Sequence, residues 1–349
     1  MKKPILFLII FIIIITILSD CQYFTLLSQK EWTEMSGNED NVIIYVAGAY
    51  QDRFGNGIPC YWKIKDDNIK RVDLDNESNN NNYASSIYVV GDKVYTSGTV
   101  ELSGGVLKAC YWIDTKRYNL NTSGSVNSFA DSIIVKGGVV FAAGGDGTKG
   151  CYWIDQNQAI LNLLICRTLF IQKISSSKYT TYVGGQNLKS PHQACFWKDG
   201  YLTDLPPLPG AGESSIVNSI FVIGNIVYSV GEASLMPGPV NYAYLWKNDE
   251  PIILPNGNSA RSVFVSNDDI YISGDNDSGQ ACYWKNEKYI SLSSLASVAY
   301  SIYVYNNKAY IAGYENGYAC YWINDKHYSI ENSTVSIVYG IFVKSDNEK

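Results

Sequence analysis

Short apolar runs alternate with turn residues along the chain from about residue 41 onward. Each run is four to eight residues long and rich in Val, Ile, Tyr and Phe, which favour β-strands. Turn pairs such as Asp199 and Gly200 separate the runs. Beyond the N-terminal segment, no stretch of the sequence sustains the period of 3.6 residues that an amphipathic helix requires. The pattern predicts an all-β protein.

Three short phrases recur in a fixed order and mark a repeating unit. The first is Ser followed by apolar and aromatic residues, as at 86–89; the second is aromatic, any residue, small residue and Gly, as at 95–98. The third is small residue, Cys, aromatic and Trp, as at 109–112. Four short strands in each unit of about 40 to 45 residues predict the blade of a β-propeller. The third phrase supplies the structural repeat residues Trp62, Trp112, Trp153, Trp197, Trp246, Trp284 and Trp322.

The two ends of the chain predict how the propeller closes. The first unit begins at its second strand, near Val42, and a surplus first-strand phrase at 339–343 follows the seventh unit. If the C-terminal strand at 335–343 joins the three N-terminal strands, the ring is complete and two open sheet edges disappear. We therefore predict a seven-bladed β-propeller of four-stranded blades over residues 42–349.

The first 41 residues predict export and a lipid anchor. Two lysines precede an apolar run at 4–18, which is typical of a secretory signal peptide, here residues 1–20. The motif that ends at Cys21 resembles the lipobox of bacterial lipoproteins and departs from it at Asp20. The resemblance implies lipid attachment at Cys21, a tether over 21–41 and a membrane-anchored location on the periplasmic or cell-surface side. An uncleaved anchor is the alternative, but a spanning helix needs about 20 apolar residues.

Composition excludes some functions. The formal charge is −6 and the sequence has no run of Lys or Arg, which argues against nucleic-acid binding. Six of the eight cysteines hold equivalent positions in different units, too far apart for disulfides, so we expect buried free thiols. The two histidines, His192 and His327, stand alone and offer no zinc site.

Loop lengths predict which face carries function. The loops between the second and third strands, and those between blades, vary in length and emerge on one face, whereas the others are uniformly short. Because variable loops on a rigid scaffold carry recognition, this face is the candidate binding surface. Asp131 and Arg261 lie just before an innermost strand, and Tyr300 is expected near them at the channel mouth. The hairpins on this face add Asp146, Asp275 and Asp277.

Three functions remain open from these residues. We expect a binding module at the cell envelope with a protein or glycan as ligand, no catalytic residue, and only a lipid anchor in contact with membrane. The alternative is an envelope glycan hydrolase or lyase with acidic residues at the channel mouth; the third is a structural protein. No cofactor is expected, although residues 275–279 resemble a calcium loop that lacks its distal Glu.

One part of the repeat resembles a known family. The run at 194–205, with Asp204 and Leu205 at its end, and the run at 242–246 are similar to the HAF repeat of extracellular bacterial proteins. The kelch repeat is a weaker relative, because its double glycine occurs only at 144–145 and 184–185. Both resemblances imply a β-propeller, and neither implies an activity or catalytic residues.

Overall fold

The computed structural model describes residues 41–76, 82–123, 127–161, 163–175, 178–206, 214–235, 240–331 and 334–347. The residues from Val42 onward form a unit separate from the N-terminal segment. The signal peptide, the tether and the lipid attachment at Cys21 fall outside the described residues. The described part of the chain contains no helix long and apolar enough to cross a membrane.

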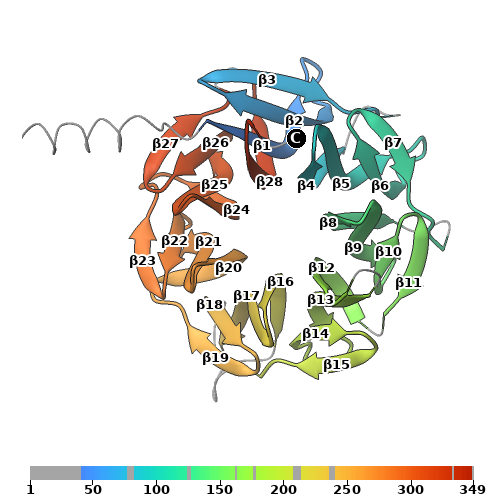
Figure 1. Ribbon diagram of the computed structural model, residues 1–349, viewed down its shortest axis with the longest axis vertical. Helices are drawn as coiled ribbons and strands as arrows, with labels where there is room; N and C mark the ends of the chain where they lie inside the picture. Colours follow the sequence, from blue (N-terminus) through green and yellow to red (C-terminus); the bar gives the residue numbers. More distant parts are fainter. Residues whose placement is uncertain are drawn as a thin grey trace, which may run out of the picture. The chain divides into compact units, whose positions relative to one another are not determined.

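The unit Val42–Lys349 is a seven-bladed β-propeller, as predicted. Seven separate four-stranded antiparallel sheets are arranged in a ring around one axis (Figure 1). We number the blades in chain order, starting from the sheet β28-β1-β2-β3. The innermost strands are β28 (Ser336–Ser345), β4 (Tyr83–Val90), β8 (Ser128–Lys136), β12 (Leu163–Lys173), β16 (Ser215–Ile223), β20 (Gly257–Ser266) and β24 (Ser297–Tyr305).

Three further strands complete each blade outward from the channel. The second strands are β1 (Val42–Gln51), β5 (Lys93–Glu101), β9 (Val139–Asp146), β13 (Tyr179–Asn187), β17 (Ile226–Leu235), β21 (Asp269–Asn276) and β25 (Lys308–Glu315). The third strands are β2 (Gly57–Lys65), β6 (Leu107–Ile113), β10 (Lys149–Ile154), β14 (Ala194–Lys198), β18 (Val240–Lys247), β22 (Ala281–Lys285) and β26 (Tyr318–Ile323). The outer strands are β3 (Asn68–Asp73), β7 (Lys116–Asn119), β11 (Asn157–Ile160), β15 (Tyr201–Asp204), β19 (Glu250–Ile253), β23 (Lys288–Ser291) and β27 (Lys326–Ser329).

Blade one closes the ring with strands from both ends of the propeller. β28 pairs antiparallel with β1, and the register places Ile44 opposite Val343 and Tyr45 opposite Phe342. The predicted closure by the C-terminal strand is therefore confirmed. The strand begins at Ser336 and runs two residues beyond its expected end at residue 343.

The repeated tryptophans hold neighbouring blades together. Trp112 is fully buried in a cluster that combines blade two with Tyr45 and Leu74 of blade one. Its indole Nε1 also donates to the Asp75 carbonyl oxygen, at 2.7 Å, in the linker between these blades. Each such Trp therefore buries apolar area and satisfies a linker carbonyl. The same bond to a linker carbonyl recurs at Trp153, Trp246 and Trp284.

The third phrase also places the cysteines inside the blades. All seven cysteines in the described ranges are free and buried. Burial raises the pKa of the Cys151 and Cys195 thiols to about 12, so both remain protonated and pack as small apolar groups.

A polar turn between the third and fourth strands fixes the register of each blade. In blade seven Asn324 adopts φ 55°, and its side-chain oxygen accepts the N–H of Ala309 at 3.0 Å. Asp and Asn tolerate this left-handed conformation and bond nearby backbone groups, so they suit the position. The equivalent bond is made by Asp114, Asp155, Asp199, Asn248 and Asn286.

Every innermost strand carries a β-bulge at the same level. In blade six the register passes from Ala260 opposite Gly274 to Ser262 opposite Ser273, which leaves Arg261 unpaired in the ladder. The bulge brings the Ser259 carbonyl so close to Gly274 that a Cβ there would lie 2.0 Å from the oxygen. The Gly of the second phrase thus makes room for the bulge. Equivalent contacts of 1.8–2.1 Å would arise at Gly48, Gly98, Gly144, Gly185, Gly231 and Gly313.

Candidate functional site at the channel mouth

The seven bulges place seven side chains, of five residue types, around one end of the channel. A bulge inserts an extra residue and re-aims its side chain, here toward the axis. The residues on either side of it repeat from blade to blade, whereas the bulged residue does not. In order from blade one, the bulged residues are Tyr339, Ser85, Asp131, Arg167, Asn218, Arg261 and Tyr300.

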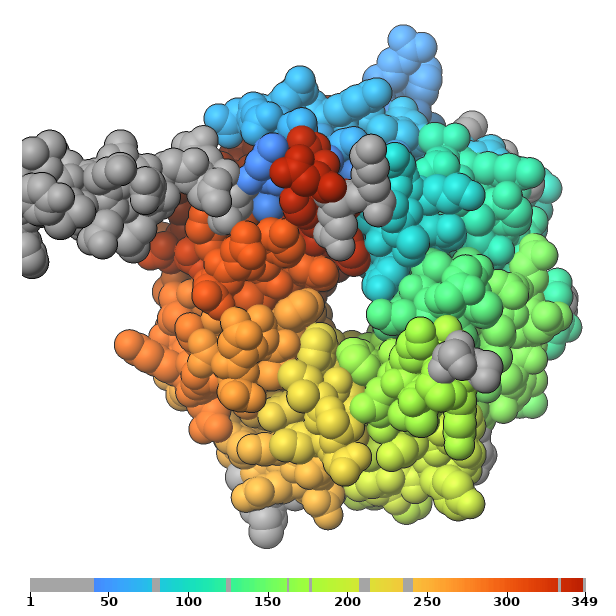
Figure 2. All heavy atoms as spheres, in the orientation of Figure 1, coloured from blue at the N-terminus to red at the C-terminus, as the bar shows by residue number. Residues whose placement is uncertain are grey.

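These seven residues line a cavity of about 380 Å³, which we call the mouth cavity. Tyr83, Ile216 and Glu232 complete its lining. A smaller hollow of about 130 Å³ beneath it is lined by the Ser residues of the first phrase. The channel is open through the centre of the propeller (Figure 2). A ligand at the mouth would therefore meet an asymmetric ring of side chains on an otherwise repetitive scaffold.

Two ion pairs stand on one side of the mouth cavity. Arg167 Nη1 lies 3.2 Å from the Asp131 carboxylate, and Arg261 Nε lies 2.7 Å from the Asp275 carboxylate. Asn258 Nδ2 donates to the same Asp275 side chain at 2.8 Å and helps to fix it. Each guanidinium has a carboxylate partner and keeps further N–H groups that can donate to a ligand.

Burial perturbs one of these carboxyls. The Asp131 side chain is only 16% exposed, whereas Arg167 is 44% exposed. Burial raises the pKa of Asp131 from 3.8 to about 6, although the charge and hydrogen bond of Arg167 oppose this shift. Asp131 therefore changes charge near neutral pH.

Tyrosines form the other side of the mouth cavity. The ring centroids of Tyr300 and Tyr339 are 5.1 Å apart, and those of Tyr83 and Tyr339 are 5.9 Å apart. The Arg261 guanidinium lies over Tyr300 at 5.2 Å from the ring centroid. Burial raises the pKa of all three tyrosines, so their hydroxyls stay neutral at physiological pH. The mouth cavity thus combines planar polar groups with aromatic rings.

The Ser residues below the mouth link adjacent blades. Ser86 Oγ accepts the Ile133 N–H at 3.3 Å, and Ser219 Oγ accepts the Val263 N–H at 3.2 Å. These bonds run from one innermost strand to the next, so they hold the bulges at a fixed spacing around the channel.

The structure brings some of the predicted site residues together. Asp131, Arg261 and Tyr300 all line the mouth cavity, and Asp275 lies behind Arg261. Asp131 and Arg261 lie inside the innermost strands β8 and β20, so their expected position just before a strand was wrong. The strands extend past the bulge because the ladder resumes on its far side.

Two predicted residues lie away from the mouth cavity. Asp146 is buried in blade three, where its carboxylate accepts the Ser123 N–H at 2.6 Å and Gln158 Nε2 at 2.9 Å. Burial alone would raise the pKa of Asp146, but these hydrogen bonds outweigh it and lower the pKa. Asp277 is exposed at a hairpin tip of blade six.

Two of the residues that resemble a calcium loop have partners within the protein. Asn276 Oδ1 accepts the N–H groups of Ser278 and Gln280, at 2.9 and 3.0 Å, and the Asp275 carboxylate holds Arg261. Within the described ranges, no group of three or more His, Cys, Asp or Glu side chains could hold a metal ion. The Asn276 oxygen stabilises a hairpin turn, and the Asp275 carboxylate fixes Arg261.

Sequence reasoning missed Arg167, Asn218 and Tyr339 at the mouth. All three precede the Ser of the first phrase or its counterpart, in the pattern small or apolar residue, variable residue, Ser, Thr or Gly. Aligning the seven units on that Ser would have found them, because it exposes one divergent column between two repeated ones.

Comparisons with known proteins support the fold alone. No family model matches the chain, and no curated protein matches it. A protein provisionally described as a 6-phosphogluconolactonase from Bacteroides uniformis has a similar structure, with TM-score 0.51 and 9% identity over 88% of this chain and 100% of that one. A protein of the same description from Bacteroides fragilis gives 0.47 and 12%, over 87% and 98%. The β-propeller domain of the trilobed protease from Pyrococcus furiosus gives 0.45 and 10%, over 84% and 95%.

Proposed function

We propose that the protein is a binding module that takes a neutral saccharide into its mouth cavity. The observation that carries the proposal is the divergence of the seven bulged residues on a scaffold that otherwise repeats. A residue that only stabilises a blade would recur in each blade, as the tryptophans do. A position that holds five residue types in seven blades serves something that lacks sevenfold symmetry.

The chemistry of the lining favours a sugar. Tyr300 and Tyr339 offer aromatic rings against which the apolar face of a sugar can pack. Arg167, Asn218 and Arg261 offer donors for hydroxyl groups, and Asp131 offers an acceptor. Because each arginine is already paired with a carboxylate, the site suits a polar uncharged ligand better than an anion.

Binding of labelled neutral and acidic oligosaccharides to the purified protein tests this proposal. We expect one neutral class to bind, and we expect Arg167→Gln to weaken it on the order of tenfold, the usual effect of losing one charged hydrogen bond. Asp277→Asn is the matched control, since it removes a charge from the hairpin tip outside the cavity. Equal losses in both variants, or a preference for acidic sugars, would contradict the proposal.

A glycan hydrolase or lyase is the second candidate. The raised pKa of Asp131 supports it, because a buried carboxyl that titrates near pH 6 can act as a general acid. The pairing of Asp131 and Asp275 with arginines favours binding instead. Turnover of the bound oligosaccharide, lost in Asp131→Asn while binding persists, would identify an enzyme.

Export, lipid attachment at Cys21 and a site at the cell envelope complete the proposal, supported by the signal-like N-terminus. Placement among HAF-repeat or kelch-like proteins is also a proposal, supported by the runs at 194–205 and 242–246. Radiolabelled palmitate incorporation, compared between the parent protein and Cys21→Ser, would test the anchor.

A further inference from the structure

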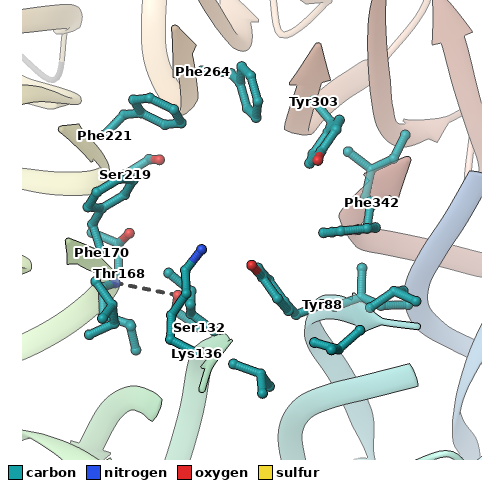
Figure 3. A pocket seen from close by; sticks show the side chains of 18 of the residues that line it. Tyr88, Ser132, Lys136, Thr168, Phe170, Ser219, Phe221, Phe264, Tyr303 and Phe342 are labelled. Atoms are coloured by element: carbon teal, nitrogen blue, oxygen red, sulfur yellow. Dashed lines mark hydrogen bonds between the residues drawn. The ribbon is translucent and has the colours of Figure 1, made fainter. Parts of the chain in front are cut away.

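Below the Ser level, the channel is lined by a collar of aromatic rings. Each innermost strand directs one more side chain at the channel, two residues after the Ser of the first phrase, and in six of seven blades it is Phe or Tyr. Figure 3 shows these rings around an open centre. The collar consists of Tyr88, Phe170, Phe221, Phe264, Tyr303 and Phe342.

The collar is a continuous arc of ring contacts. Five successive pairs have centroids 4.8–5.2 Å apart and interplanar angles of 48–60°. Tilted contacts of this kind stabilise the arc. All six residues are half-buried, so each ring keeps part of its surface open to the channel. The arc is broken at blade three, where Ile134 takes the aromatic position.

The break in the arc holds a positive charge. Lys136, two residues beyond Ile134, reaches into the channel, and its Nζ lies 5.7 Å from the Tyr88 ring centroid (Figure 3). Lys344 lines the same cavity, and its Nζ donates to the Gly91 carbonyl at 2.6 Å. The described residues that line this cavity include no carboxylate. The cavity therefore combines an aromatic collar with a positive end, although the whole chain carries −6.

The dimensions of the collar restrict what can enter. Its cavity has a volume of about 750 Å³, within the range of small-molecule sites. Seven positions spaced about 5 Å apart on a circle lie about 6 Å from its centre, so the ring centroids lie about 6 Å from the channel axis. When the space that the rings themselves occupy is subtracted, the opening is about 4 to 8 Å wide. A single hydrocarbon chain fits this opening, and a branched ligand is too wide.

We propose that the collar binds a small amphiphilic anion, with its alkyl chain along the channel axis and its carboxylate at Lys136. This site differs from the mouth cavity in residues, polarity and charge. The apolar chain would lie against the exposed surfaces of the rings. The Lys136 ammonium group would pair with the carboxylate of the ligand, whose negative charge the aromatic rings cannot stabilise.

Calorimetric titration of the full-length protein with dodecanoate, below its micelle concentration, tests the proposal. We expect one dodecanoate per chain, and binding at least about tenfold weaker for dodecyltrimethylammonium, which has the same chain and the opposite charge. Lys136→Gln should weaken dodecanoate on the order of tenfold. Lys93→Gln, which changes an exposed lysine outside the cavity, should leave it unchanged.

Two further variants establish whether dodecanoate binds inside the collar. Ile134→Trp should fill the break in the arc and abolish binding, with circular dichroism showing that the propeller is intact. Arg167→Gln at the mouth cavity should not affect dodecanoate. Absence of binding to the parent protein, equal affinity for both amphiphiles, or equal losses in the Lys136 and Lys93 variants would overturn the proposal. A loss in Arg167→Gln would overturn it too.

Discussion

The substitution Gly274→Ala tests whether the β-bulge of blade six requires a glycine on the neighbouring strand. In Gly274→Ala the new Cβ would lie 2.0 Å from the Ser259 carbonyl oxygen and 3.0 Å from Trp284 Cζ3. Non-bonded atoms prefer about 3.5 Å, so the strand or the bulge must move by more than about 1 Å. Forcing atoms into a packed site costs roughly 1–3 kcal/mol. We expect the free energy of unfolding to fall by about 3 kcal/mol, because the neighbour is backbone and cannot swing away.

The direction of the change in stability distinguishes a steric clash from the usual effect of Gly→Ala. Gly274 has an ordinary strand conformation, where Gly→Ala without a clash would stabilise by about 0.4–1 kcal/mol through the unfolded state. For a chain of this size we expect the melting temperature to fall by about 6 °C, measured by scanning calorimetry. Gly279→Ala is the control: no atom lies within 4 Å, and its φ of +70° should cost only about 1 kcal/mol. An unchanged or higher melting temperature in Gly274→Ala would refute our account of the bulge.

Three further predictions concern stability. Between about pH 4 and 6, Asp131 binds a proton in the folded protein but not in the unfolded chain, so the free energy of unfolding should fall by up to about 3 kcal/mol as pH rises through this window. The urea midpoints at pH 4.5 and pH 7 should therefore differ less in Asp131→Asn than in the parent protein. An unchanged difference would count against this assignment to Asp131. Trp153→Phe should lower the free energy of unfolding by about 1–2 kcal/mol more than Trp322→Phe. Trp153→Phe removes the hydrogen bond from the indole to the Asn121 carbonyl, whereas the Trp322 Nε1 is buried without a partner among the described residues. Equal urea midpoints would disprove this. Asn324→Ala should cost about 1–2 kcal/mol by denaturation and Asn324→Gly less, since Gly retains the φ of 55°; the reverse order would be inconsistent with our reading of the turn.

The architecture could be predicted because repetition amplifies a weak signal. A single phrase such as 109–112 says little, but seven copies in register with two other phrases define four strands and seven blades. The unpaired strand phrases at the two ends then fix the closure. Each of these inferences depends on alternation and counting, which a sequence displays directly.

The site was predicted only in part because a bulge interrupts alternation. The expected two-residue period assigns Arg167 and Asn218 no special direction, and the extra residue becomes visible only when Cα partners are known. Asp146 and Asp277 were selected by charge and loop position. Neither criterion distinguishes a carboxylate that accepts backbone N–H groups, as at Asp146, from one that faces a ligand.

The shared blade also sets the order of events during synthesis. Among the strands of the described residues, β1 emerges from the ribosome first and its partner β28 last, about 300 residues later. At roughly 5–20 residues per second this interval lasts about 15–60 s. The other six blades can be completed in sequence, while the inner edge of β1 in blade one remains unpaired until β28 is made. A chain that stops before Ser336 would lack the strand that pairs with β1. Its ring would stay open with an exposed strand edge, so premature termination should yield a protein that aggregates rather than a slightly shorter propeller.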